Sequence, residues 1–315
     1  MKKVVLIGTG NVGVTVVYTM ITKGIDAEYV LIDINTEFAK GHAMDMSDAI
    51  ALNSTTGSKI RTGTYADAKG ADLLIVAAGR PQKQGETRLE MIADNSKIMK
   101  DIALEIKKSG FNGFTIVISN PVDILATVFQ KVTNFPKEKV MSSGTFLDTS
   151  RFRKFLSEKT GVPTNSVHGF VIGEHGDKSV VVFSRMQIGF SRLDDFLKSK
   201  ALTEDDLKWI SEKTYKEAYE IINRKRSTYF GIGASVAEMA ESVLYNQRRI
   251  FPIGIYLDES KPGGGIYISR PAILGENGWE EVKNYDLSPA EQKAFDESAI
   301  NLKKHWDDVQ KEISF

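Results

Sequence analysis

The stretch that decides the fold is Lys3-Val4-Val5-Leu6-Ile7-Gly8-Thr9-Gly10-Asn11-Val12-Gly13, close to the start of the chain. Residues 3–7 form a short, mostly apolar run of the kind found in strands buried on both faces. A helical pattern follows over residues 14–22. The three glycines between them let the backbone approach a pyrophosphate, which rests on free N–H groups at a helix N-terminus. The stretch therefore predicts a dinucleotide site made by Gly8, Gly10, Asn11, Val12 and Gly13.

A second apolar run, residues 29–32, ends at Asp33, which lies 20 residues after Gly13. An acid at this spacing accepts hydrogen bonds from the adenosine ribose hydroxyls. Its negative charge also repels a 2′-phosphate, so the predicted cofactor is NAD rather than NADP. A tight glycine turn is the alternative for the motif alone, but the flanking strands and Asp33 favour dinucleotide binding.

Strand-like and helix-like segments continue to alternate up to residue 143. Such alternation is typical of a parallel sheet with helices on both faces and ligands at the carboxyl ends of its strands. We therefore expect an α/β protein: a doubly wound parallel sheet of the Rossmann type over residues 1–144, followed by a C-terminal α+β substrate domain over residues 145–315. The alternating segments are predicted to be helices over residues 36–49, 88–108 and 122–132, and strands over residues 72–78, 114–119 and 139–143.

Composition narrows the function classes. The chain has 315 residues, and its 41 basic and 41 acidic side chains cancel. No block of one sign appears, so nothing favours binding to nucleic acid or to a membrane surface. The absence of cysteine fits a reducing compartment, and the glycines from residue 8 onward interrupt the apolar start before it resembles a signal peptide. We expect a cytoplasmic protein that has no membrane span and no metal site.

The best candidate for proton chemistry is His175, one of four histidines, in the stretch Ile172-Gly173-Glu174-His175-Gly176-Asp177. Histidine exchanges a proton near neutral pH, and the two glycines leave room for a small molecule to approach the ring. A histidine that only caps a loop is the alternative. The polar segment 79–88 leaves a predicted strand and suits a lid over the cofactor, although Arg88 alone resembles a surface charge.

Asp148 and Arg151 are three residues apart at the start of a helical pattern, so they project from one face. A surface ion pair is the commoner explanation for this spacing. A guanidinium at such a position can also bind a carboxylate through two parallel hydrogen bonds, which lysine cannot do.

These motifs together resemble those of the L-lactate and malate dehydrogenase family, in the same order and over nearly the whole chain. The matching segments are residues 8–13, Asp33, 82–88, Ser119-Asn120-Pro121, Leu147-Asp148-Thr149-Ser150-Arg151 and 173–177.

The resemblance implies reversible hydride transfer between NADH and the C2 carbonyl of a 2-oxo acid. His175 would supply the proton, and Asp148 would fix its tautomer and favour the imidazolium. Arg88 would stabilise charge on the carbonyl oxygen, and Arg151 would anchor the substrate carboxylate. Asn120 matches a residue beside the nicotinamide ribose and the substrate oxygen.

The substrate side chain would face Gln82, where malate enzymes of the family carry an arginine. A neutral residue leaves a second carboxylate unpaired, so pyruvate and L-lactate fit better than oxaloacetate and malate. Thr228 matches a threonine that limits side-chain room, and Ile232 matches a residue near the nicotinamide. Malate or branched 2-hydroxy acid dehydrogenases remain alternatives. So does a nicotinamide-binding sensor or structural protein without the chemistry.

Arg153 and His168 match the residues that bind fructose 1,6-bisphosphate at a subunit interface in many bacterial lactate dehydrogenases. The resemblance therefore implies an allosteric anion site and a homotetramer, with two solvated surface charges as the alternative. Three features depart from the family pattern: Gln84 replaces a proline of the lid, Arg226 replaces the glycine before Ser227 and Thr228, and Arg80-Pro81 resembles malate enzymes. The Gln84 change bears on closure of the lid, and the Arg226 change bears on the shape of the pocket.

Overall fold

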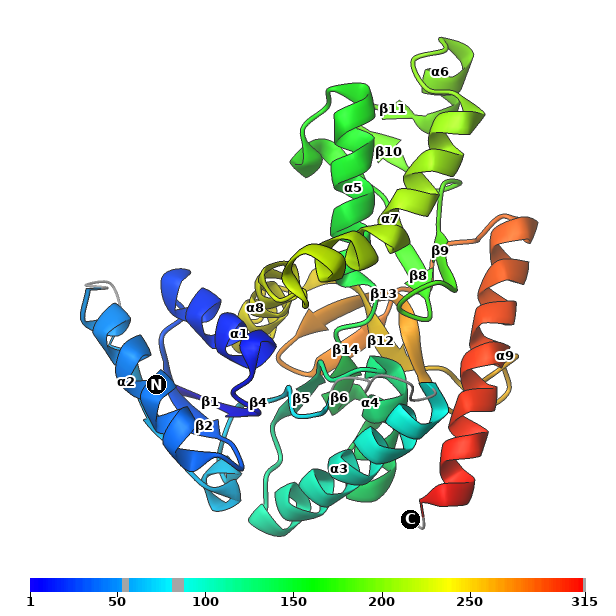
Figure 1. Ribbon diagram of the computed structural model, residues 1–315. Coiled ribbons are helices and arrows are strands. Elements are labelled where there is room, and N and C mark those ends of the chain that lie inside the picture. The colour runs from blue at the N-terminus through cyan, green and yellow to red at the C-terminus, as the bar shows by residue number, and fades with distance from the viewer. Residues whose placement is uncertain (53–56, 81–87, 314–315) are drawn as a thin grey trace.

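The computed structural model describes residues 1–52, 57–80 and 88–313, apart from the side chains of residues 88 and 89. The first half forms a parallel sheet with the strand order β3-β2-β1-β4-β5-β6 (Figure 1). This order confirms the predicted doubly wound sheet. Its strands are β1 (Lys2–Ile7), β2 (Ala27–Ile32), β3 (Lys59–Thr62), β4 (Leu73–Val76), β5 (Phe114–Val117) and β6 (Val140–Ser142).

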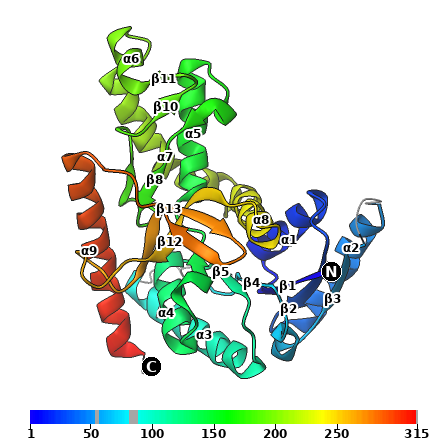
Figure 2. The same cartoon turned by 180° about the vertical axis from the view of Figure 1, so that it is seen from behind.

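Alternate residues of β1 pack on opposite faces of this sheet, because successive side chains of a strand point in opposite directions. Val4 and Leu6 belong to the core under α1, α2 and α8, whereas Val5 and Ile7 belong to the core under α3, α4 and α9. Figure 2 shows the two groups of helices on the two sides of the sheet. These helices are α1 (Asn11–Thr22), α2 (Thr36–Leu52), α3 (Arg88–Ser109), α4 (Val122–Thr133), α8 (Phe230–Leu244) and α9 (Pro289–Glu312).

The second half extends the same sheet. The strands β12 and β13 form an antiparallel hairpin, and Gly254 of β12 pairs with Ser142 of β6. One sheet therefore runs through both halves, and the boundary between residues 144 and 145 stays a prediction. The second-half strands are β7 (Val167–His168), β8 (Val171–Gly173), β9 (Ser179–Val181), β10 (Gln187–Ile188), β11 (Ser191–Arg192), β12 (Arg249–Tyr256), β13 (Tyr267–Gly275) and β14 (Gly278–Glu281).

Three further helices form a lobe with its own core beyond the sheet (Figure 1). They are α5 (Phe146–Thr160), α6 (Leu193–Lys198) and α7 (Glu204–Lys225). Capping boxes begin α7 and α9: Thr203 Oγ1 accepts from the N–H of Asp206 at 3.2 Å, and Ser288 Oγ accepts from the N–H of Glu291 at 3.4 Å.

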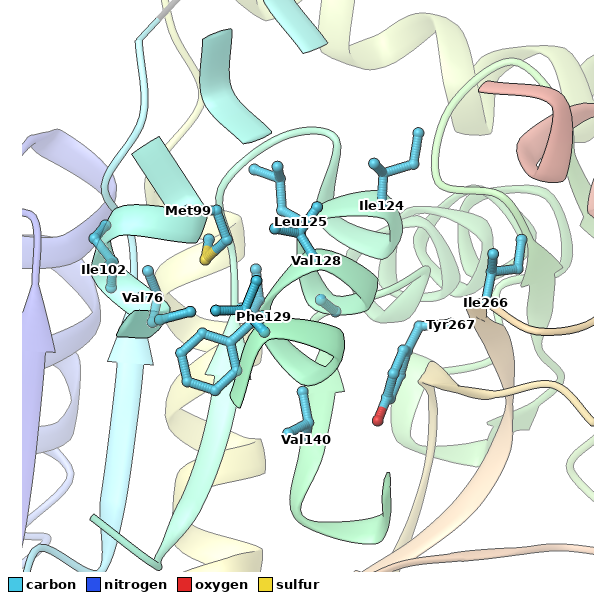
Figure 3. Packing of buried hydrophobic residues seen from close by; sticks show 14 of the residues in the cluster. Val76, Met99, Ile102, Ile124, Leu125, Val128, Phe129, Val140, Ile266 and Tyr267 are labelled. Carbon is cyan, nitrogen blue, oxygen red and sulfur yellow. The ribbon is translucent and has the colours of Figure 1, made fainter. Parts of the chain in front are cut away.

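The core joins the two halves through α4. Figure 3 shows Phe129 and Val128 of this helix in one packed cluster with Val76 of β4, Met99 of α3 and Tyr267 of β13. Within the described residues, no helix combines the length and the apolar character that crossing a bilayer would require.

Arg226 ends α7 with φ 72°, in the left-handed region, and its N–H donates to the carbonyl of Ile222 at 2.7 Å. This conformation strains a residue that has a Cβ by about 1 kcal/mol, whereas glycine adopts it without this strain.

We expect Arg226→Gly to raise the free energy of unfolding by about 0.5–1 kcal/mol, because it removes this strain. Urea denaturation of the purified variant measures the change. Arg226→Ala is the matched control, since it removes the same side chain but keeps the strain. Equal stability of the two variants would show that the backbone conformation is not the cause.

Candidate active site

Two connected cavities lie at the carboxyl ends of β4 and β5. The outer one has a volume of about 610 Å³ and the inner one about 160 Å³. Residues from both halves of the chain line both of them. These shared residues are Val12, Ile118, Asn120, Val122, His175, Ile222 and Thr228. Arg151 and Ile232 line the inner cavity, so six predicted site residues surround one place: Val12, Asn120, Arg151, His175, Thr228 and Ile232.

The glycine-rich turn has the shape that a pyrophosphate requires. Gly8 has φ +96°, and a Cβ there would lie 2.6 Å from the backbone nitrogen of Ala78. A Cβ on Gly13 would overlap with the carbonyl oxygen of Gly8, whereas Gly10 has nothing within 4 Å of its Cβ position. Gly10 also precedes α1 without any side-chain cap, so the first N–H groups of the helix face no competing side chain.

Asp33 closes this turn from the end of β2. Its Oδ2 accepts hydrogen bonds from the N–H of Thr9 at 2.7 Å and from the Thr9 hydroxyl at 2.9 Å. Its Oδ1 accepts from the N–H of Asn35 at 2.9 Å. Burial opposes ionisation, but these hydrogen bonds outweigh it and lower the pKa of Asp33. A fixed carboxylate beside the turn fits the ribose hydroxyls of NAD.

A short contact between charged groups at the cavity joins His175 to Asp148. The Nδ1 atom of His175 lies 2.6 Å from Oδ2 of Asp148. The Asp148 side chain is 1% exposed and the His175 side chain 27% exposed, so the ring reaches the cavity while its partner does not. The attraction of Asp148 raises the pKa of His175 against the effect of burial. Burial opposes the ionisation of Asp148, but His175 and Arg151 overcome it, and the pKa of Asp148 is lowered.

The other oxygen of Asp148 contacts Arg151. Nη1 of Arg151 lies 3.3 Å from Oδ1 of Asp148, and Nε lies 3.5 Å from Oε2 of Glu217 on α7. Only 7% of the Arg151 side chain is exposed. A buried guanidinium held on the cavity wall by two acids is suited to bind an incoming carboxylate. Glu217 was not predicted from the sequence, because its partner Arg151 lies 66 residues earlier in the chain.

The loop that carries His175 is fastened to α9 and α7. The N–H of Glu174 donates to Ser298 Oγ at 2.9 Å, and Asn301 Nδ2 donates to Glu174 Oε2 at 3.1 Å. The Tyr219 hydroxyl donates to Asp177 at 3.0 Å. These anchors come from distant parts of the chain, so no local motif could have indicated them.

Asn120, which lines both cavities, is held by Asn95. Its carbonyl accepts from Asn95 Nδ2 at 3.0 Å, and Asn95 Oδ1 accepts from the N–H of Arg80 at 2.9 Å. Arg80 in turn pairs with Asp94 at 2.6 Å. Asn95 therefore links the start of the predicted lid to the wall of the cavity.

Some of the predicted site residues either lie outside the described residues or do not line the two cavities. Gln82 and Gln84 lie outside the described residues. Arg88 begins α3, but its side chain is outside the description as well. Arg153 and His168 line neither cavity: Arg153 Nε donates to the carbonyl of Gly169 at 3.2 Å, directly after the exposed His168. In the described ranges, no three histidine, aspartate or glutamate side chains are arranged to hold a metal ion.

Family models match both halves of the chain. The NAD-binding domain of lactate/malate dehydrogenases matches residues 2–142, and the α/β C-terminal domain of the same family matches residues 145–313.

Relatives and solved structures agree with this match. An L-lactate dehydrogenase of Mycoplasma mycoides is 45% identical over 98% of this chain and 97% of its own length. L-lactate dehydrogenase 2 of Lactococcus lactis is 39% identical over 96% of each chain. The minor L-lactate dehydrogenase of Enterococcus mundtii, in a ligand-bound crystal structure, is 38% identical, with a TM-score of 0.93 over 97% of this chain and 98% of that one. A lactate dehydrogenase from a deep-sea metagenome library gives a TM-score of 0.94 at 36% identity, over 98% of this chain and 99% of that one. The chain therefore belongs to the lactate/malate dehydrogenase family, whose cofactor is NAD.

Proposed function

We propose that the protein is an L-lactate dehydrogenase that interconverts pyruvate and L-lactate with NAD, as in glycolysis and fermentation. The observation that carries the proposal is the contact of one buried carboxylate, Asp148, with both His175 and Arg151 at a cavity of about 160 Å³. A proton donor and a carboxylate receptor side by side are the two groups that a small 2-oxo acid requires. The named relatives support the same substrate.

In this proposal NADH, when bound, supplies the hydride to the carbonyl carbon of pyruvate. Arg151 binds the substrate carboxylate and fixes the orientation of the carbonyl group. His175 donates the proton from Nε2 to the carbonyl oxygen, because Nδ1 is engaged with Asp148. In the reverse direction the neutral ring accepts the hydroxyl proton of lactate, and Asp148 stabilises the imidazolium that forms.

Further residues complete the proposed site. Asn120, Val12, Thr228 and Ile232 line the inner cavity. We assign Asn120 to both the substrate and the cofactor, Val12 and Ile232 to the cofactor, and Thr228 to the substrate side chain. We assign stabilisation of the carbonyl oxygen to Arg88 and selection of the substrate side chain to Gln82, on the family pattern alone.

We expect His175→Asn to lower kcat/KM for pyruvate by at least about 10²-fold, because the proton donor is lost. Arg151→Leu should cause a loss of similar size through misplaced substrate. NADH oxidation followed by absorbance measures both. His305→Asn, the same substitution on α9, is the control and should retain wild-type activity. Undiminished activity in either site variant would contradict the assigned roles.

A panel of 2-oxo acids separates the alternatives. Pyruvate should be the best substrate, ahead of oxaloacetate and 2-oxoisocaproate, because a neutral Gln82 offers no partner to a second carboxylate. Oxaloacetate as the best substrate would instead indicate a malate dehydrogenase. NADH that binds but is consumed with none of these acids would indicate a sensor.

We further propose that the enzyme is a cytoplasmic homotetramer activated by fructose 1,6-bisphosphate. Arg153 and the exposed His168 lie near one another through the contact with Gly169, which suits a phosphate group. Phe38 and Met44 on α2 are exposed apolar side chains of the kind that a subunit contact covers.

Fructose 1,6-bisphosphate should lower the pyruvate concentration at half-saturation, and Arg153→Gln with His168→Gln should abolish this shift but leave the basal rate intact. A pyruvate titration with and without the sugar phosphate tests this, and light scattering measures the mass. An unchanged half-saturation and rate in the wild type would contradict activation.

A further inference from the structure

Asp123 is a buried acid at the cavity that the proposed mechanism does not use. It is the second residue of α4, and it lines the outer cavity together with His175. Only 2% of its surface is exposed, although it is a carboxylic acid. Acids are rarely buried to this extent without a partner or a role.

The carboxyl group has a specific but incomplete set of contacts. Its Oδ1 accepts a hydrogen bond from Ser142 Oγ on β6 at 2.5 Å, and Ser142 Oγ accepts from the N–H of Gly144 at 3.2 Å. Its Oδ2 is buried and lacks a partner at full hydrogen-bond geometry among the described residues, although the backbone amide of His175 interacts with the carboxyl group. An unpaired oxygen on a buried acid calls for a physical explanation.

Neighbouring strands leave room for this pair. Gly254 of β12 lies opposite Ser142 in the sheet, and a Cβ at Gly254 would overlap with both Ser142 Oγ and Asp123 Oδ1. Any other residue at 254 would therefore displace the Asp123 carboxyl group.

The electrostatic surroundings connect Asp123 to His175. Burial raises the pKa of Asp123 to about 7, while Ser142, the imidazolium and the backbone amide of His175 favour the ionised form, and Glu174 opposes it. Asp148 has the largest effect on His175 and raises its pKa, and Arg151 lowers it. Asp123 adds a smaller effect that also raises the pKa of His175. Each of the two groups therefore influences the protonation of the other.

We propose that Asp123 is a positioning residue for proton transfer: its carboxylate, held by Ser142, places a second negative charge beside His175 and keeps the imidazole in the proton-donating form. This inference rests on the proposed reduction of pyruvate. The competing explanation is that Asp123 only holds the backbone at the start of α4.

The pH profile of kcat/KM for pyruvate distinguishes the two explanations. Reduction requires protonated His175, so the rate falls as pH rises through the pKa of this group. Asp123→Asn keeps the size of the side chain and its acceptor for Ser142 but removes the charge. The alkaline limb should then move to lower pH by about half a unit or more. Affinity for NADH, measured by fluorescence, should stay unchanged.

Three further variants calibrate the result. Asp148→Asn removes the stronger charge and should shift the limb further in the same direction. Ser142→Ala removes a hydrogen bond that favours ionised Asp123, so it should give a smaller shift of the same sign, and it tests the proposal if Asp123→Asn does not fold. Asp205→Asn, an exposed acid in the first turn of α7, should give no shift.

A folded Asp123→Asn enzyme with lower activity but an unshifted limb would overturn the proposal in favour of the backbone role. A wild-type protein that reduces no 2-oxo acid would contradict the proposed function instead. In that case NMR titration of the His175 ring in the same variants still tests the effect of Asp123.

Discussion

The site depends on one buried carboxylate that contacts two cations. Asp148 is 1% exposed, and its oxygens lie 2.6 Å from His175 Nδ1 and 3.3 Å from Arg151 Nη1. Burying a lone charge is costly, so Asp148 keeps its charge only because both partners are present. The lowered pKa of Asp148 means that its stabilising contribution is lost as pH falls through that value. The raised pKa of His175 means that its contribution is lost as pH rises through that value. Between the pKa of Asp148 and the pKa of His175, the same ion pair therefore stabilises the fold and keeps His175 in its proton-donating form.

The fold brings these three groups together from separate elements. Asp148 and Arg151 lie in the first turns of α5, directly after the last parallel strand, whereas His175 follows β8. Pairing of β6 with β12, and of β13 with β8, joins these segments into one sheet. Contacts of α9 with Glu174 then fix the loop. The packed α4 cluster in Figure 3 fixes the two halves relative to each other, which the short distances at Asp148 require.

Local patterns predicted much of this structure. The glycine turn and Asp33 indicated the parallel sheet, because a dinucleotide site needs a strand, a tight turn and a helix in that order. The strand β3 was missed, since Lys59–Thr62 is short, mostly polar and at the edge of the sheet. The anchors of the histidine loop and the partner Glu217 could not be predicted, because they depend on tertiary contacts. Asp123 was missed for another reason: an acid in the first turn of a helix is commonly explained by favourable interaction with the helix N-terminus. The roles of Arg88 and Gln82 stay predictions.

The protonation state of His175 tests this account most directly. NMR titration of the protein labelled with ¹⁵N-histidine would follow the ring nitrogens of all four histidines, with His175→Asn assigning the signal. The account predicts that the His175 ring keeps its second proton above pH 6.5, the ordinary value, and that its neutral form carries the remaining proton on Nδ1, towards Asp148. A ring that loses the proton at or below pH 6.5, or whose neutral form carries it on Nε2, would contradict the central claim that Asp148 controls the proton donor.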